Sequence, residues 1–140
     1  MDSKNILILS HKPPYPKRDG GSIAIAQVLE TLLEQGHQVT FLCMETHKHP
    51  SKNSLTNNNL IFKTIFVNTK LKIVSGFLNM FTKQSYILKR FDQKEFRESL
   101  KKILKKNTFD TIIFESLFTS AYLDTVIKLS NAKKLYRAHN

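Results

Sequence analysis

Asn5-Ile-Leu-Ile-Leu-Ser10 is a short apolar run without alternation, and it opens the stretch of sequence that decides the fold. Such a run is typical of a strand buried on both faces, as in a parallel sheet. After a polar loop the chain reads Asp19-Gly20-Gly21-Ser22 and continues as Ile23-Ala-Ile-Ala-Gln-Val-Leu-Glu-Thr-Leu-Leu-Glu-Gln35. Apolar residues recur at helical spacing in this second part, so we predict a strand at 5–10 and a helix at about 22–35.

The start of this helix is suited to a ligand. Asp19 or Ser22 is expected to cap it, and the glycines Gly20 and Gly21 let a ligand approach the backbone closely. The free N–H groups and partial positive charge of a helix N-terminus favour an anion such as a phosphate. Gly36 ends the helix, and a second strand at 38–43 completes a β-α-β unit.

The rest of the chain repeats this alternation. Further strands are predicted at 60–67, 109–115 and 134–140, and helices near 73–82, at 93–107 and at 116–129. The pattern predicts a single α/β domain over residues 1–140, with a Rossmann-like, doubly wound parallel sheet. Ligands of such sheets bind at the carboxyl ends of the strands, near the point where the strand order reverses.

The positive charge of the chain is concentrated in one segment. Residues 63–106 hold 12 of the 22 Lys and Arg residues but only three acidic residues, and the net charge of the whole chain is +11. Such a segment favours anionic partners, which include lipid headgroups, nucleic acid and phosphorylated substrates. Cys43 is the only cysteine, so a disulfide framework and a CxxC metal site are excluded, and a reducing cytoplasm is expected.

Four features of the sequence occur together in a defined order. They are the Pro-rich loop ending in Asp19-Gly20-Gly21-Ser22, the segment Gly36-His37-Gln38-Val39, the segment Phe109-Asp-Thr-Ile-Ile-Phe-Glu115, and Tyr136-Arg137-Ala138-His139-Asn140. In this order and spacing the chain resembles the N-terminal half of a GT-B glycosyltransferase, most closely glycosyltransferase family 4. The resemblance covers essentially all 140 residues.

The resemblance implies an activity and a set of site residues. Members of the family transfer a sugar from a nucleotide-sugar to an acceptor, with retention at the anomeric carbon, and usually need no metal or other cofactor. Gly20 and Gly21 match the loop near the donor diphosphate and the acceptor, and His139 matches the histidine that contacts the transferred sugar. Arg137 and Asn140 flank that histidine, and Glu115 with Ser116 lies where the acceptor pocket is usually bordered.

The resemblance also implies what the chain lacks and where it acts. The sequence ends at Asn140, before the C-terminal domain that holds most of the nucleotide-sugar, so we expect the isolated chain to have no appreciable transfer activity. The expected partners are a nucleotide-sugar, a sugar or lipid-linked acceptor, and the missing domain. Residues 71–106 combine aromatic and aliphatic residues with lysines, which suits docking on an anionic membrane. The resemblance therefore implies a role in cell-envelope or polysaccharide synthesis. It also implies a cytoplasmic location, peripheral on the inner face of the membrane.

Several alternatives stay open at the level of the sequence. The glycine pair also fits a simple turn, Glu115 fits a cap of the following helix, and the basic helix fits a solvated surface. His37 is expected to be structural, and the segment 47–49 is not favoured as a metal site because no clear third ligand accompanies it. The rival function is a basic, non-catalytic α/β module that binds nucleic acid or another polyanion, although no nucleic-acid motif is present.

Overall fold

The computed structural model describes residues 2–68 and 91–138. These residues form one parallel sheet with the strand order β3-β2-β1-β4-β5. The strands are β1 (Asn5–Ser10), β2 (Gln38–Glu45), β3 (Leu60–Phe66), β4 (Thr111–Glu115) and β5 (Lys133–Arg137). Every neighbouring pair is parallel, which confirms the predicted α/β class and the Rossmann-like, doubly wound arrangement.

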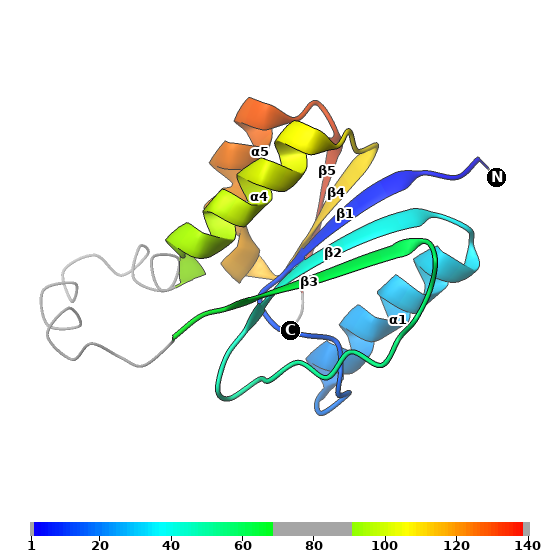
Figure 1. Cartoon of the computed structure of the whole chain (residues 1–140), viewed down its shortest axis with the longest axis vertical. Helices are drawn as coiled ribbons and strands as arrows, with labels where there is room; N and C mark the ends of the chain where they lie inside the picture. Colours follow the sequence, from blue (N-terminus) through cyan, green and yellow to red (C-terminus); the bar gives the residue numbers. More distant parts are fainter. Residues whose placement is uncertain (1, 69–90, 139–140) are drawn as a thin grey trace, which may run out of the picture.

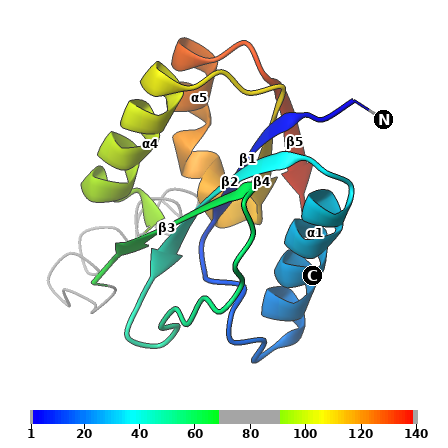
Figure 2. The same ribbon diagram turned by 45° about the vertical axis from the view of Figure 1, so that its right-hand side comes forward.

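Helices cover both faces of this sheet. Helix α1 (Gly20–Glu34) lies against one face, and α4 (Lys94–Lys106) and α5 (Leu123–Leu129) lie against the other (Figure 1; Figure 2). A 3₁₀ helix, η1 (Leu117–Tyr122), connects β4 to α5. The central strands β1 and β4 are therefore buried on both faces, which is why their sequences are apolar without alternation.

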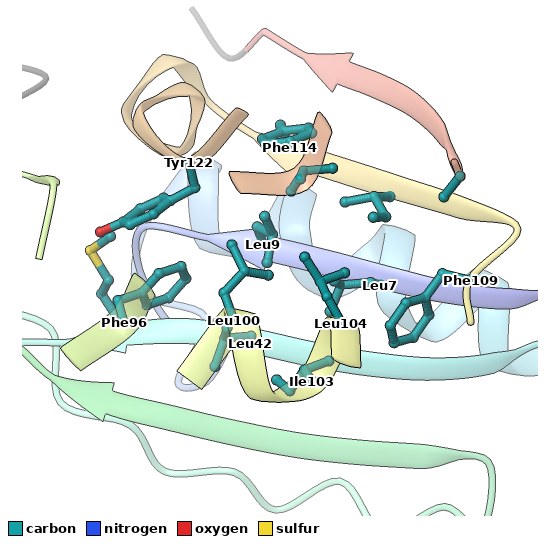
Figure 3. Close-up of a cluster of buried hydrophobic side chains, with 14 of the residues drawn as sticks. Leu7, Leu9, Leu42, Phe96, Leu100, Ile103, Leu104, Phe109, Phe114 and Tyr122 are labelled. Carbon is teal, nitrogen blue, oxygen red and sulfur yellow. The ribbon is translucent and has the colours of Figure 1, made fainter. Parts of the chain in front are cut away.

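The larger core cluster lies between the sheet and α4. Phe96, Leu100 and Leu104 of α4 point toward Leu7 and Leu9 of β1 (Figure 3). Residues 96, 100, 103 and 104 recur at helical spacing, and all four are buried. Complete burial of one such side chain contributes about 1.5–3 kcal/mol, so this stripe determines how α4 sits on the sheet.

The second cluster lies between the sheet and α1. Ile25, Leu29 and Leu33 pack with Ile8 of β1 and Phe41 of β2. Helix α1 begins at Gly20, two residues earlier than predicted, because Asp19 and Ser22 act together rather than as alternatives. The Asp19 side chain accepts the Ser22 N–H at 2.7 Å, and Ser22 Oγ accepts the Asp19 N–H at 3.0 Å, which makes a capping box.

The helix predicted over 116–129 starts one residue later, and its first half is the 3₁₀ helix η1 rather than an α-helix. The chain leaves β4 through Ser116, whose φ is +76° and ψ is 162°. A residue in this backbone conformation cannot belong to a right-handed helix, so the helical segment begins only at Leu117. The predicted helix near 73–82 lies outside the described residues. The strand predicted at 134–140 corresponds to β5, which ends at Arg137, and residues 139 and 140 lie outside the described residues.

Candidate functional site at the carboxyl edge of the sheet

The strand register aligns the ends of the central strands in one row. Ser10 of β1 is the register partner of Cys43 in β2 and of Glu115 in β4, and Glu115 is in turn the partner of Arg137 in β5. Because all these strands are parallel, their carboxyl ends meet at the same edge of the sheet. From β1 the chain goes to β2 on one side, and β4 follows on the other, so the order reverses between β1 and β4.

Glu115 and Arg137 form an ion pair at this edge. Arg137 Nη1 donates to Glu115 Oε1, and the Glu115 side chain is completely buried while the Arg137 side chain keeps 28% of its surface exposed. A buried carboxylate is costly unless it is paired, and Arg137 supplies an opposite charge to the Glu115 carboxylate. The residue at the N-cap position of η1 is Ser116, whose side chain makes no capping hydrogen bond.

Ser116 is held in a strained backbone conformation. Its φ of +76° and ψ of 162° lie in a region that is essentially confined to glycine and costs roughly 1–3 kcal/mol for other residues. The Ser116 N–H donates to the Arg137 carbonyl at 3.0 Å, and the Ser116 carbonyl accepts the Thr119 hydroxyl at 2.9 Å. These two hydrogen bonds hold the peptide group before Ser116 and the peptide group after it.

Ser116 also contacts a histidine that the sequence interpretation did not single out. Its Oγ lies 2.8 Å from Nδ1 of His11, the first residue after β1. Such a hydrogen bond contributes a net stabilisation of about 0.5–1.5 kcal/mol, which is less than the upper part of the strain range. The bond alone does not explain a serine at this position. The only signal in the sequence was the position of His11 directly after a buried strand.

Two aromatic rings surround this histidine. The Phe118 ring centroid lies 5.0 Å from that of His11, and the Phe91 centroid lies 6.3 Å away with the two ring planes nearly perpendicular. Phe91 and Phe118 contact each other at 4.3 Å between centroids. The carboxyl edge between β1 and β4 thus combines an imidazole, a hydroxyl, a carboxylate with its guanidinium, and an aromatic wall.

The glycine pair lies inside the first turn of α1 rather than in the loop before it. A Cβ atom at Gly20 would meet no atom within 4 Å, so this glycine faces open space. A Cβ atom at Gly21 would lie 2.6 Å from Nζ of Lys12, so the Lys12 ammonium covers this part of the backbone. The expected contact of both glycines with a ligand stays a prediction, and at Gly21 the flexible end of the Lys12 side chain would have to move aside.

Lys12 is the second residue of the site that the sequence interpretation missed. Its ammonium donates to Asp19 Oδ1 at 2.7 Å, and only 13% of its side chain is exposed. Hydrogen bonds from Lys12 and from the Ser22 N–H hold the pKa of Asp19 well below the usual range of a carboxyl group. Burial and the positive charge of Lys12 lower the pKa of His49, in the loop after β2. An ammonium group at a helix N-terminus is chemically suited to a phosphate.

Other sequence predictions fall away from this edge or outside the described residues. His139 and Asn140 lie outside them, so their expected roles stay predictions. His37 is buried and its Nδ1 accepts the Lys4 N–H at 3.1 Å.

Among residues 2–68 and 91–138, no three His, Cys, Asp or Glu side chains come together as a metal site would require. None of the helices in that part of the chain is long and apolar enough to span a bilayer.

Two grooves on the helical layer lie apart from these residues. One, of about 540 Å³, runs between α4 and α5 and is lined by Arg97 and by lysines that include Lys101, Lys105 and Lys128. The other, of about 440 Å³, lies between β3 and α4 and is lined by Lys63, Lys94 and Lys102 among others. Neither lining includes a residue of the carboxyl edge described above, so the basic surface and the candidate site are separate features.

Comparison of the sequence with protein-family models and with curated proteins gives no match.

Proposed function

We propose that this chain is the acceptor-binding half of a retaining glycosyltransferase of GT-B architecture, which transfers a sugar from a nucleotide-sugar to an acceptor in cell-envelope or polysaccharide synthesis. One observation carries the proposal: the start of α1 and the Glu115–Arg137 pair lie at the same carboxyl edge as the strained Ser116. Open α/β sheets bind ligands at this edge, and the residues implied by the family resemblance that the structure describes are found there.

The proposed roles divide along the edge. Gly20 and Gly21, together with Lys12, would face the diphosphate of the donor, because a helix N-terminus and an ammonium both favour a phosphate. Glu115, Ser116 and Arg137 would border the acceptor, since carboxylate, hydroxyl and guanidinium groups match the donors and acceptors of a sugar. His139 would contact the transferred sugar, with Asn140 beside it. No metal or other cofactor is proposed.

The test is made on the product of any longer reading frame that contains this sequence, here called the extended protein. With acceptors present, the extended protein should release nucleotide from one of a panel of UDP-, GDP-, ADP- and TDP-linked sugars. His139→Ala in the extended protein should abolish transfer, and His47→Ala, an exposed histidine of the loop after β2, is the control. An extended protein that binds and turns over no nucleotide-sugar would contradict the proposal.

The basic surface supports a second part of the proposal, which is docking on an anionic membrane that carries a lipid-linked acceptor. Helix α4 presents lysines to solvent, and α5 exposes Ile127 and Leu123, with 60% and 39% of their surfaces accessible. Lysines beside exposed aliphatic residues are the composition of an interfacial surface. A cytoplasmic protein, peripheral on the inner face, is proposed accordingly. The expected segment 71–106 is described only from residue 91 onward.

The same lysines favour a second candidate function, a basic module that binds nucleic acid or another polyanion. Its signature is binding to DNA or heparin that weakens steeply as the salt concentration rises, because such binding releases condensed counterions. The aromatic residues described above are core or edge residues rather than an exposed stacking platform, which favours the first candidate.

A further inference from the structure

The groove between β3 and α4 has a buried hydroxyl group in its wall. Among the residues that the structure describes, Ser99 Oγ is the one buried side-chain polar atom without a hydrogen-bond partner. Only 7% of Ser99 is exposed, and a helical residue lines a groove through its side chain, because the backbone of the helix lies beneath. A buried hydroxyl group without a partner is unfavourable for folding, so Ser99 needs an explanation other than stability.

The same groove carries an excess of positive charge. Its lining contains three lysines, all exposed and without an ion-pair partner among the described residues: Lys63 of β3 and Lys94 and Lys102 of α4. Glu95 and Glu98 also line it, but Glu98 pairs at 3.2 Å with Lys101, which lies outside this lining. Lysines from two elements beside a hydroxyl group favour an anionic ligand.

The groove between α4 and α5 lacks this combination. Its buried hydroxyl group, that of Thr125, accepts a hydrogen bond from Nη1 of Arg97. Arg97 also pairs with Asp92 and with Asp124, each at 2.8 Å. The polar groups of this second groove are therefore satisfied within the chain, and its lysines fit a solvated surface.

We propose that the groove between β3 and α4 binds a phosphate monoester group, which accepts hydrogen bonds from Ser99 Oγ and from the ammonium groups of Lys63 and Lys102. A phosphate monoester carries about −1.5 to −2 charges at pH 7 and three acceptor oxygens, which match a hydroxyl donor flanked by lysines. Ser99 Oγ is shielded from solvent, so it makes this bond after its side chain turns to another staggered position or a lysine end moves aside.

The site lies apart from the carboxyl edge, and the inference does not depend on the sugar-transfer proposal. Two sources supply the same chemistry, namely a small phosphorylated compound and the headgroup of a phospholipid. The experiments below test the phosphate group first and then distinguish these sources.

The first experiment follows the backbone amides of the full 140-residue chain by ¹⁵N NMR during a titration with glycerol phosphate at constant ionic strength. We expect saturable shifts at Lys63, Ser99 and Lys102. The amides of Lys105 and Lys128, which line the other groove, should stay unchanged. A titration with sodium chloride gives the background. The absence of saturable shifts in the first three amides would overturn the inference.

Two lysine variants distinguish a defined site from diffuse charge. Lys102→Met should weaken glycerol phosphate binding about tenfold, because it removes a charge-assisted hydrogen bond. Lys105→Met is the matched control, since this lysine is also an exposed residue of α4 but lines the other groove, and it should change the affinity less than about twofold. Equal losses in the two variants would overturn the inference.

Ser99→Ala separates binding from folding, because affinity and stability should change in opposite directions. Loss of the hydroxyl group should weaken glycerol phosphate binding about fivefold. The melting temperature should rise, since the substitution removes a buried group without a partner and alanine is the better helix former. Ser120→Ala, whose hydroxyl group is bound to the Leu117 carbonyl, is the control and should leave the affinity unchanged. Wild-type affinity or a lower melting temperature in Ser99→Ala would refute the role of Ser99.

Flotation with vesicles distinguishes the two sources of the phosphate. Phosphatidic acid presents a phosphate monoester, whereas phosphatidylglycerol presents a similar negative charge without one. A lipid ligand predicts stronger flotation with phosphatidic acid, which Lys102→Met reduces more than Lys105→Met does. Equal flotation with both lipids, together with binding of glycerol phosphate, assigns the groove to a small phosphorylated compound. The membrane proposal fails separately if the chain floats with neither lipid while glycerol phosphate still binds.

Discussion

The two glycines at the start of α1 are neighbours in sequence but have different surroundings. Gly20 faces open space, while the Lys12 ammonium lies over Gly21 and is fixed there by Asp19. Neither glycine has a positive φ, since the positive-φ glycine of the described residues is Gly36. The reason for a glycine at 21 is therefore the space that Lys12 occupies, and the reason at 20 is not found in the fold.

This difference predicts opposite effects of the same substitution. Gly20→Ala should raise the free energy of unfolding by about 0.5 kcal/mol, because alanine loses less backbone entropy in a helix. Gly21→Ala should gain nothing or lose stability, since the new methyl group displaces Lys12 from Asp19. Urea denaturation of both variants measures the difference. Equal stabilisation in the two variants would show that Lys12 does not occupy this space.

The cap of α1 gives the protein a pH-dependent contribution to stability. The pKa of Asp19 is lower in the folded chain than in the unfolded chain, so its ionised form stabilises the fold above the ordinary carboxyl pKa of about 4. As the pH falls below about 4 toward the lower folded pKa, this contribution is lost. Asp19→Asn keeps a capping side chain but cannot titrate.

We therefore expect the unfolding free energy of the wild-type chain to fall more steeply below pH 4 than that of Asp19→Asn. Asp19→Ala, which removes the cap and the Lys12 partner, should cost about 1 kcal/mol at pH 7. Chemical denaturation at a series of pH values checks both statements. Parallel curves for the wild type and the asparagine variant would contradict the assignment of this acid sensitivity to Asp19.

At the scale of elements, β5 depends on the ion pair at its carboxyl end. The strand is exposed along most of its length, and Leu135 and Tyr136 keep 39% and 51% of their surfaces accessible. Little apolar burial therefore holds it to β4. The Glu115–Arg137 pair, with the bond from the Ser116 N–H to the Arg137 carbonyl, fixes the end of the strand.

Arg137→Met should destabilise the chain by about 3 kcal/mol, because it leaves the buried carboxylate of Glu115 without its guanidinium. Hydrogen exchange should show the loss first in the amides of β5. Lys133→Met, on the same strand but exposed, should change stability by less than about 0.5 kcal/mol. The double variant Glu115→Gln with Arg137→Met should recover part of the loss, and a loss no larger than that of Lys133→Met would refute this account of β5.

At the scale of the whole molecule, the charge and the candidate site occupy different surfaces. Helix α4 packs on the sheet through Phe96 and Leu100 (Figure 3). Most of its lysines, which include Lys102, Lys105 and Lys106, are exposed. With this arrangement, the proposed membrane contact and the proposed substrate site would use different surfaces. It also allows the membrane proposal to be tested without disturbing the site.

The chain should float with vesicles that contain acidic phospholipid and not with vesicles of phosphatidylcholine alone. Reversal of two exposed lysines of α4, in Lys102→Glu with Lys106→Glu, should reduce this binding at least about tenfold, since each lysine near an anionic surface contributes about 1 kcal/mol. Lys4→Glu with Lys52→Glu changes the net charge equally at other exposed positions and is the control. Salt-sensitive binding to DNA without binding to either vesicle would favour the polyanion-binding alternative.

The spacing of apolar residues in the sequence was sufficient to predict elements such as β1 and α4, because this spacing reflects the local geometry of strands and helices. The run at 5–10 coincides with β1, and the stripe at 96, 100, 103 and 104 is the buried face of α4. The break at Ser116 was not predictable in this way, since helical spacing of side chains carries no information about one positive φ. Glu115, Ser116 and Arg137 were predicted as site residues from their places at strand ends and from the family resemblance. The contacts between them could not be predicted from the sequence.

By itself the sequence determined that the chain makes a parallel α/β sheet with a capped helix after its first strand, because burial on both faces and helical spacing are written in neighbouring residues. Only the tertiary structure decided that His11 meets Ser116 and that Lys12 covers Gly21. The physical reason is the strand order: β1 lies between β2 and β4, and which strands become neighbours depends on how the two helical layers pack, which no local pattern specifies.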